Sequence, residues 1–133
     1  MLLEIGARLH GGENPVLAAQ CGARSHVEQT VRAFADPARF AADGRDGYEL
    51  THHCTVAFLM PQSPGRLRAR PRAERIEALA AFHKVEIADC VGEPVPPVIG
   101  WVALVHPDKQ IVDASLAELR SLEADDFYPV DPL

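Results

Sequence analysis

Apolar and polar side chains alternate near the start of the chain. Leu3, Ile5, Ala7 and Leu9 alternate with polar or small residues, and a Gly-Gly pair follows shortly afterwards. A period of two is typical of a strand with one buried face, and a glycine pair is typical of a turn. We therefore predict a strand over residues 3–9. The short segment 16–20 fits a helix and a strand equally well.

The next segments change to a helical period. Ser25 followed three residues later by Glu28 is a capping-box pattern, and apolar residues then recur on one helical face. This helix is predicted to break at Asp36-Pro37, because the residue before a proline is disfavoured in the α conformation. We expect its apolar face and Phe40 to reach the core. Further helices are predicted over 72–83, with Ile76, Leu79 and His83 on one face, and from the capping box formed by Ser115 and Glu118.

Three later segments are predicted to be strands. Residues 48–60 form the longest, which ends before Pro61. Residues 84–91 form another. Residues 98–105 are apolar at almost every position, which is typical of a central strand covered on both faces.

The order of these elements predicts an α+β fold. We expect a two-layer sandwich in which a roughly four-stranded sheet has helices packed on one face. The chain has 133 residues and no linker long enough to separate domains, so we expect a single domain over 1–133. Residues 123–133 are acidic and proline-rich, and they are predicted to form an arm.

Composition narrows the function classes. The hydrophobic fraction is 47% and the net charge is −6, which excludes a disordered chain and gives no global attraction to nucleic acid or anionic lipid. No apolar run approaches the roughly 20 residues of a membrane span, and the first residues lack a signal pattern, so we expect a cytoplasmic protein without a membrane partner. Three widely spaced cysteines form no Cys-x-x-Cys pair. We expect no metal and no cofactor.

The long strand carries the clearest candidate chemistry. Because side chains alternate across a strand, the apolar set is expected to pack on the helices. The opposite face then carries Thr51, His53 and Thr55 in a row. The apolar set comprises Leu50, His52, Cys54, Val56, Phe58 and Met60.

His53-Cys54-Thr55-Val56 resembles the H-x-[ST]-h signature of the 2H phosphoesterase superfamily, the RNA 2′,5′-ligase and cyclic phosphodiesterase group. The resemblance covers roughly residues 48–122. It implies two such motifs on adjacent strands, with two histidines as general acid and base and two hydroxyls holding phosphate oxygens. No second H-x-[ST] occurs in this chain. His106, at the end of the predicted central strand, is the best stand-in for the second histidine. An enzyme of this kind would be a metal-independent phosphodiesterase.

A loop rich in arginine follows the long strand. Arginine forks suit phosphate groups, so Arg66, Arg68 and Arg70 are predicted to attract a nucleotide or RNA end toward His53 and Thr55. A degenerate site would bind such a ligand without turning it over.

Two other function classes stay open. The small size, the acidity and the exposed loop also fit a non-catalytic interaction protein, such as an immunity protein, an antitoxin or an adaptor, whose ligand is a protein partner. The third class is a small dimeric enzyme or ligand-binder with a pocket on the sheet face, in which Phe58, Met60 and Trp101 line an apolar cavity. A possible homodimer belongs to this third class.

Overall fold

The structure is a computed structural model that describes residues 12–22, 25–44, 49–125 and 127–132. The strand predicted over residues 3–9 lies outside these residues. The chain divides into two compact units, Met1–His52 and His53–Leu133. The expectation of a single domain stays a prediction, and each unit is described by itself.

The described part of the first unit is helical. It contains α1 (Asn14–Gln20), α2 (His26–Ala35) and α3 (Pro37–Asp43). The segment that fitted a helix or a strand is thus a helix, and a proline stands in its first turn. The predicted break at Asp36-Pro37 is confirmed. Asp36 leaves the helical conformation, with φ at −146°, and its side chain accepts a hydrogen bond from the Arg39 backbone N–H at 3.0 Å.

The apolar stripe of α2 differs from the prediction. None of its residues is buried, and Phe34 is 85% exposed. Phe40, which we expected in the core, is also exposed. A helical period shows that a face is suited to burial but does not supply a partner, and no described side chain of this unit covers the stripe. Arg32 joins α2 to α3 through an ion pair with Asp43 at 2.7 Å, and it also pairs with Glu28 of its own helix at 2.6 Å.

The second unit is built on an antiparallel sheet. Its strands are β1 (His53–Leu59), β3 (Phe82–Ile87) and β4 (Gly100–His106), in the order β1-β4-β3. A separate pair joins β2 (Arg66–Leu67) to β5 (Val130–Asp131). The α+β fold is confirmed, and so is the central position of β4. Within the residues that the structure describes, the sheet has three strands, where the sequence predicted roughly four.

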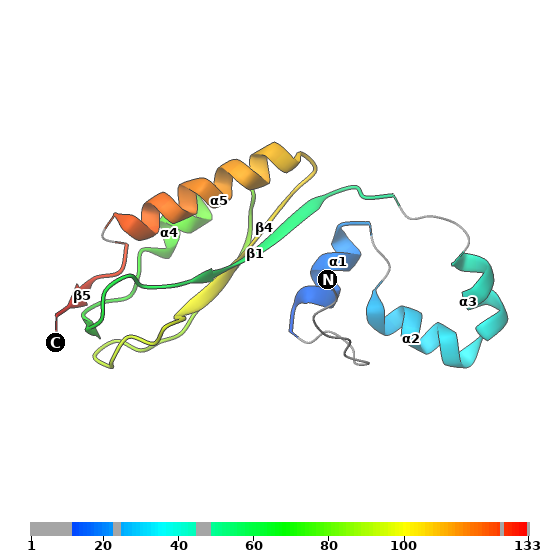
Figure 1. The fold of residues 1–133 in the computed structure, drawn as a ribbon, viewed down its shortest axis with the longest axis horizontal. Coiled ribbons are helices and arrows are strands. Elements are labelled where there is room, and N and C mark those ends of the chain that lie inside the picture. The colour runs from blue at the N-terminus through cyan, green and yellow to red at the C-terminus, as the bar shows by residue number, and fades with distance from the viewer. Residues whose placement is uncertain (1–11, 23–24, 45–48, 126, 133) are drawn as a thin grey trace, which may run out of the picture. The chain divides into compact units, whose positions relative to one another are not determined.

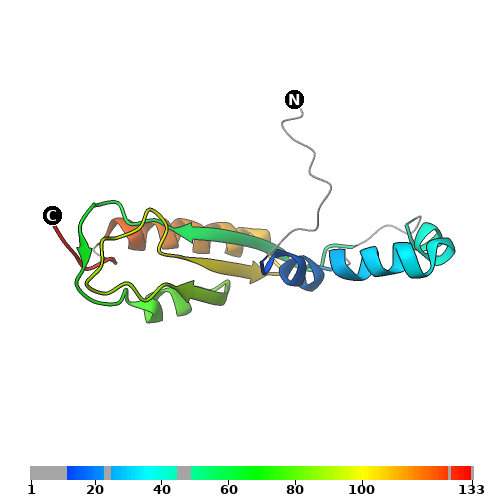
Figure 2. The ribbon, with the colours of Figure 1, turned by 90° about the horizontal axis from the view of Figure 1, so that it is seen from below.

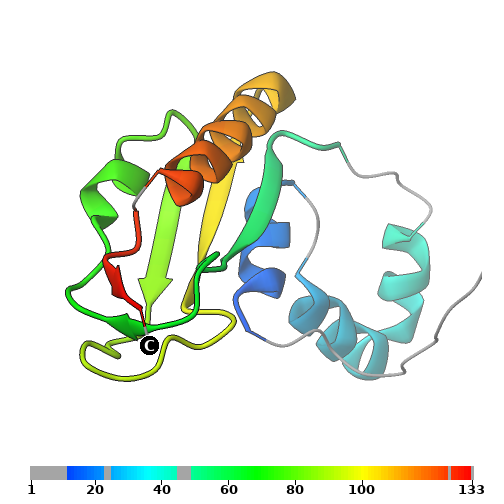
Figure 3. The same cartoon turned by 60° about the vertical axis from the view of Figure 1, so that its left-hand side comes forward.

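Two helices pack on one face of this sheet, as Figures 1 and 3 show. These are α4 (Ala73–Glu77) and α5 (Lys109–Ala124). Leu59, Val102 and Leu104 on the strands and Val112 and Leu119 on α5 have almost no exposed surface. The side chains of the core come from both layers, so burial of apolar surface ties α5 to β1 and β4.

The faces of β1 are the reverse of the prediction. Ala57 and Leu59 pack on the helices and are buried, whereas Phe58 and Met60 are 56% and 42% exposed. The observed strand is also shorter than the predicted one. β1 begins only at His53, and residues 49–52 are not in a strand. The prediction assumed that the larger apolar residues mark the core face. Here the smaller set fits beneath α5.

Three further boundaries differ. The helix predicted over 72–83 is only Ala73–Glu77, and His83 lies on β3, where it is exposed. The last helix begins after Asp108, whose side chain accepts from the Gln110 N–H at 2.8 Å. Ser115, the predicted cap, is buried inside α5, and its hydroxyl accepts a hydrogen bond from the Ala81 N–H at 3.1 Å.

The C-terminal segment is folded against the unit, in contrast to the expected arm. Glu123 belongs to the last turn of α5 and is buried, Phe127 and Tyr128 join the core, and β5 pairs with β2. Figure 2 shows the same segment from below, beside the β2 loop. The rings of Phe127 and Tyr128 make an edge-to-face contact, with centroids 4.9 Å apart. This packing holds in place a segment whose acidic composition had predicted an arm. Among the described helices, none is long and apolar enough to cross a membrane.

Candidate functional site

His53 and His106 are brought together at one end of the sheet. His53, the first residue of β1, is the direct register partner of His106, the last residue of β4. Residues directly opposite in an antiparallel pair project from the same face with Cα atoms about 5 Å apart. Thr55 shares this face because it lies two residues along β1. The two histidines and Thr55 are half-buried.

The imidazole of His106 is oriented by the chain that follows it. The Asp108 backbone N–H donates to His106 Nδ1 at 2.9 Å. Since a backbone N–H can only donate, Nδ1 carries no proton in this arrangement, and Nε2 is left as the donor. The carboxylate of Asp108 caps α5, so it places a negative charge at the same end of the sheet. The imidazoles of His53 and His106 can accept or donate a proton. The N-terminal end of α5 already holds the carboxylate of Asp108.

The predicted phosphate-binding arginines lie elsewhere. Arg66 follows the opposite end of β1, and a seven-residue strand spans about 20 Å. Arg66 donates to the Gly92 carbonyl at 2.9 Å, Arg68 lies 3.9 Å from Asp131, and Arg70 pairs with Asp89. The hydrogen bond to Asp89 raises the pKa of Arg70. Through these contacts, the three arginines join β2 and the residues that follow it to neighbouring segments.

Two other expectations concern the surroundings of His53. Thr51 belongs to the first unit, where its backbone N–H donates to the Cys21 carbonyl at 3.2 Å. No group of three or more His, Cys, Asp or Glu side chains in the described ranges could hold a metal ion. The arrangement that the structure supports is thus a pair of imidazoles with one hydroxyl.

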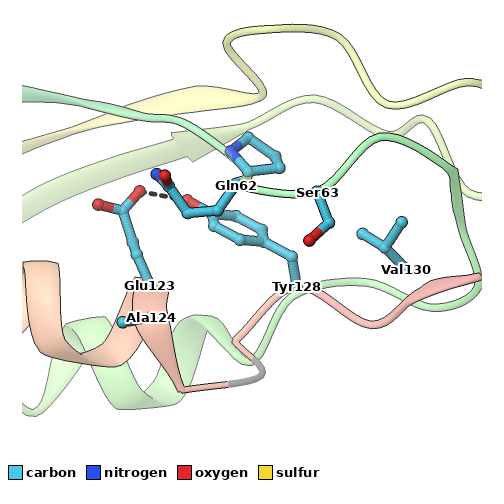
Figure 4. A pocket seen from close by; sticks show the side chains of 7 residues that line it. Gln62, Ser63, Glu123, Ala124, Tyr128 and Val130 are labelled. Carbon is cyan, nitrogen blue, oxygen red and sulfur yellow. Dashed lines mark hydrogen bonds between the residues drawn. The ribbon is translucent and has the colours of Figure 1, made fainter. Parts of the chain in front are cut away.

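A second cluster lies at the other end of β1, and the sequence did not point to it. The carboxylate of Glu123, at the end of α5, accepts from the Met60 N–H at 2.9 Å and from the Tyr128 hydroxyl at 2.5 Å, and it also pairs with Arg120. Figure 4 shows Glu123 and Tyr128 joined beside Gln62 and Ser63. Together these residues line a recess with a volume of about 270 Å³.

The environment of this cluster favours the neutral phenol of Tyr128. Burial and the hydrogen bond to Glu123 raise the pKa of Tyr128 far above its ordinary value. The three groups that contact the Glu123 carboxylate are all hydrogen-bond donors. The cluster therefore ties the end of α5 to the end of β1 and to the C-terminal segment. A glutamate in the last helical turn followed by a tyrosine was the available signal, but sequence spacing does not reveal that Met60 is the third partner.

The face of the sheet opposite α5 is the third candidate. We call it the open face. Phe58 and Trp101 are register partners on it, and the Lys84 ammonium lies 5.5 Å from the Trp101 ring centre. A groove of about 650 Å³ begins at this pair and runs to the exposed Val98. Phe58 and Trp101 line it as the third function class expected, whereas Met60 does not. The open face comprises Cys54, Val56, Phe58, Trp101, Ala103 and Val105.

Comparison with known proteins adds one relative. No protein-family model matches the chain, and no solved structure matches it at a significant level. Dapdiamide A synthase of Enterobacter agglomerans is 26% identical over 140 aligned positions. The alignment includes 96% of this chain and 32% of the synthase, so the chain spans about a third of the length of this relative.

Proposed function

We propose that this chain is one module of a synthase related to dapdiamide A synthase. The observation that supports the proposal is the extent of the similarity, which covers 96% of the chain and therefore includes both compact units. A single shared motif would align over a short stretch only. Because the match covers 32% of the synthase, the proposed activity belongs to an assembly of which this chain is a part.

The fold of the second unit suits such a role. Its helix-covered face forms a core of its own, with Leu59, Leu104 and Leu119 fully buried. On its other face, Phe58 is 56% exposed, Trp101 is half-buried and Ala103 is fully buried. A unit that folds through one face and presents the other is suited to support neighbouring parts of an enzyme.

A chimeric enzyme tests this proposal. The segment of dapdiamide A synthase that aligns with the chain is replaced by residues 1–133, and formation of dapdiamide A is measured. We expect product from the chimera and none from a synthase that lacks the segment. The control is the same chimera with Leu104→Asp, which places a charge in the core and should abolish product by unfolding the module.

The proposal would be contradicted by a chimera that folds and forms no dapdiamide A. Folding is judged by circular dichroism and by cooperative unfolding of the grafted module. A chimera as inactive as the deleted enzyme, but with a folded module, means that the chain does not perform the work of the matching segment.

A second candidate function is phosphoester handling at the histidine pair. The observation that favours it is the register pairing of His53 with His106, because acid–base catalysis of phosphoester cleavage uses two proton carriers on one face. Thr55 would hold a phosphate oxygen. The candidate no longer includes the arginines of the β2 loop, which the structure places about a strand's length away.

Hydrolysis of 2′,3′-cyclic nucleotides tests this candidate. Wild type is compared with His53→Ala, His106→Ala and His83→Ala, the last being an exposed histidine of β3. We expect turnover that is lost in the first two variants and kept in the third. Absence of turnover and of nucleotide binding in the wild type, or equal turnover in all four proteins, would rule this candidate out.

A further inference from the structure

The recess at the end of α5 has a polar wall made mainly of hydrogen-bond acceptors. The Tyr128 hydroxyl donates its hydrogen to Glu123 at 2.5 Å, and the Gln62 amide donates through Nε2 to the Met60 carbonyl at 2.9 Å. The phenol oxygen of Tyr128 and the Oε1 atom of Gln62 can still accept. The Ser63 hydroxyl, on the same wall, can accept or donate. These side chains suit a ligand that donates hydrogen bonds.

Glu123 brings a carboxylate to this recess. Its side chain is only 3% exposed, and its hydrogen-bond partners are the Met60 N–H, Tyr128 and Arg120. A carboxylate can accept about four hydrogen bonds, so these three leave one acceptor position. Arg120 also donates to the Phe58 carbonyl at 3.0 Å, and it does not line the recess. The guanidinium therefore contacts the carboxylate from the side of β1, and a ligand in the recess would contact it from another side.

The remaining walls of the recess are small and apolar. They are formed by Pro61, Ala124 and Val130, and Figure 4 shows the recess with Glu123 and Tyr128. All the lining residues belong to the described part of the chain, and none of them is lysine, arginine or histidine. Sites for drug-sized ligands have volumes of about 300–1,000 Å³. A recess of about 270 Å³ is suited to a ligand of only a few heavy atoms.

We propose that this recess binds a primary alkylammonium ion with a short aliphatic chain. An ammonium group is a compact cation with three hydrogens to donate and no acceptor, which matches Glu123, Tyr128 and Gln62. Hydrogen bonds of this kind are roughly twice as strong as those between neutral groups. The aliphatic chain would lie against the apolar walls. The site is at the opposite end of β1 from the histidine pair, and it goes beyond both candidate functions.

NMR titration of the isotope-labelled 133-residue chain with n-butylammonium chloride tests the site. The pH is neutral and the ionic strength is held constant. We expect saturable shifts of the Met60 and Ser63 backbone amides, with a Kd in the millimolar range because the ligand is small. Two ligands serve as controls. n-Butanol has the same chain without the charge, butyltrimethylammonium keeps the charge without N–H groups, and each should bind at least about tenfold more weakly.

Variants of the chain locate the binding. Ala124→Lys brings an ammonium group of the protein itself to the recess and should abolish the saturable shifts. Its matched control is Ala117→Lys, which adds the same charge at an exposed position of α5 outside the lining and should bind as wild type does. Tyr128→Phe removes one acceptor and should weaken binding by about threefold or more. Each variant is first checked for cooperative unfolding.

Several results would overturn the proposal. One is a wild type that shows no saturable shifts with butylammonium, and another is equal binding of butylammonium and n-butanol. Equal affinities of Ala124→Lys and Ala117→Lys, or an unchanged affinity in Tyr128→Phe, would place the binding outside the recess. Tighter binding of a lysine-containing tripeptide than of butylammonium would assign the recess to a lysine side chain of a protein partner and contradict its assignment to a small free amine.

Discussion

The two faces of the three-stranded sheet use similar residues for different purposes. On one face, Leu59, Val102 and Leu104 are fully buried beneath α5. On the other, Phe58 is 56% exposed, and its register partner Trp101 is half-buried. Phenylalanine and tryptophan bury more area than leucine or valine, so the larger hydrophobic side chains lie on the more exposed face. Side-chain size therefore does not identify the core face.

The largest contrast is expected from truncating one residue on each face. Leu104→Ala removes a fully buried side chain from the central strand and should lower the free energy of unfolding by about 2–5 kcal/mol. Phe58→Ala removes a larger side chain that is 56% exposed and should cost the isolated chain only about 0.5 kcal/mol. Urea denaturation measures both. Equal losses would show that the open face is part of the core.

The buried carboxylate at the end of α5 should come next. Glu123→Gln removes the charge that accepts from Met60, Tyr128 and Arg120, and we expect a loss of about 1.5–3 kcal/mol. The control is Asp113→Asn, which breaks the exposed ion pair with Lys109 and should cost less than about 1 kcal/mol. If the two variants unfold at the same urea concentration, the cluster does not fasten the C-terminal segment.

The pH dependence of stability follows from Tyr128. Its pKa is raised in the folded chain from an ordinary value of 10.0, so the unfolded chain loses this proton first as the pH rises. The stability that the neutral phenol contributes is present below pH 10 and is lost progressively above it. We expect stability to fall less steeply above this pH in Tyr128→Phe than in wild type. Parallel curves for the two proteins would contradict the burial of this hydroxyl.

A small effect is also expected from the charge that lies over Trp101 on the open face. Lys84→Met removes the charge over Trp101 and should cost about 0.5–1 kcal/mol in the isolated chain, because cation–π contacts at exposed sites are weak. It should also shift the fluorescence of Trp101, the only tryptophan of the sequence. A loss as large as that of Leu104→Ala would mean that the open face carries the fold.

The sequence predicted those parts of the fold that are determined by residues close together in the chain. Residues 98–105 are apolar on both faces, and they form the central strand β4 nearly as expected. The break at Asp36-Pro37 follows from proline sterics, which operate between neighbouring residues. Helix α5 was found, although its start was misplaced because Asp108 rather than Ser115 supplies the cap.

The remaining differences depend on long-range contacts. Both faces of β1 carry apolar residues, so only the packing of α5 decides which face is buried. The sequence placed His53 and His106 at strand ends, but their pairing depends on the register between β1 and β4. The cluster around Glu123 joins residues 60, 120, 123 and 128. No periodicity links these positions.

The most direct test of the difference between the two faces is acrylamide quenching of Trp101 in the isolated, folded chain. The partial exposure of Trp101 predicts quenching under native conditions that is well above that of a buried indole. Quenching of the isolated chain that is as weak as that of a buried indole would show that the open face is already covered, and it would contradict the account.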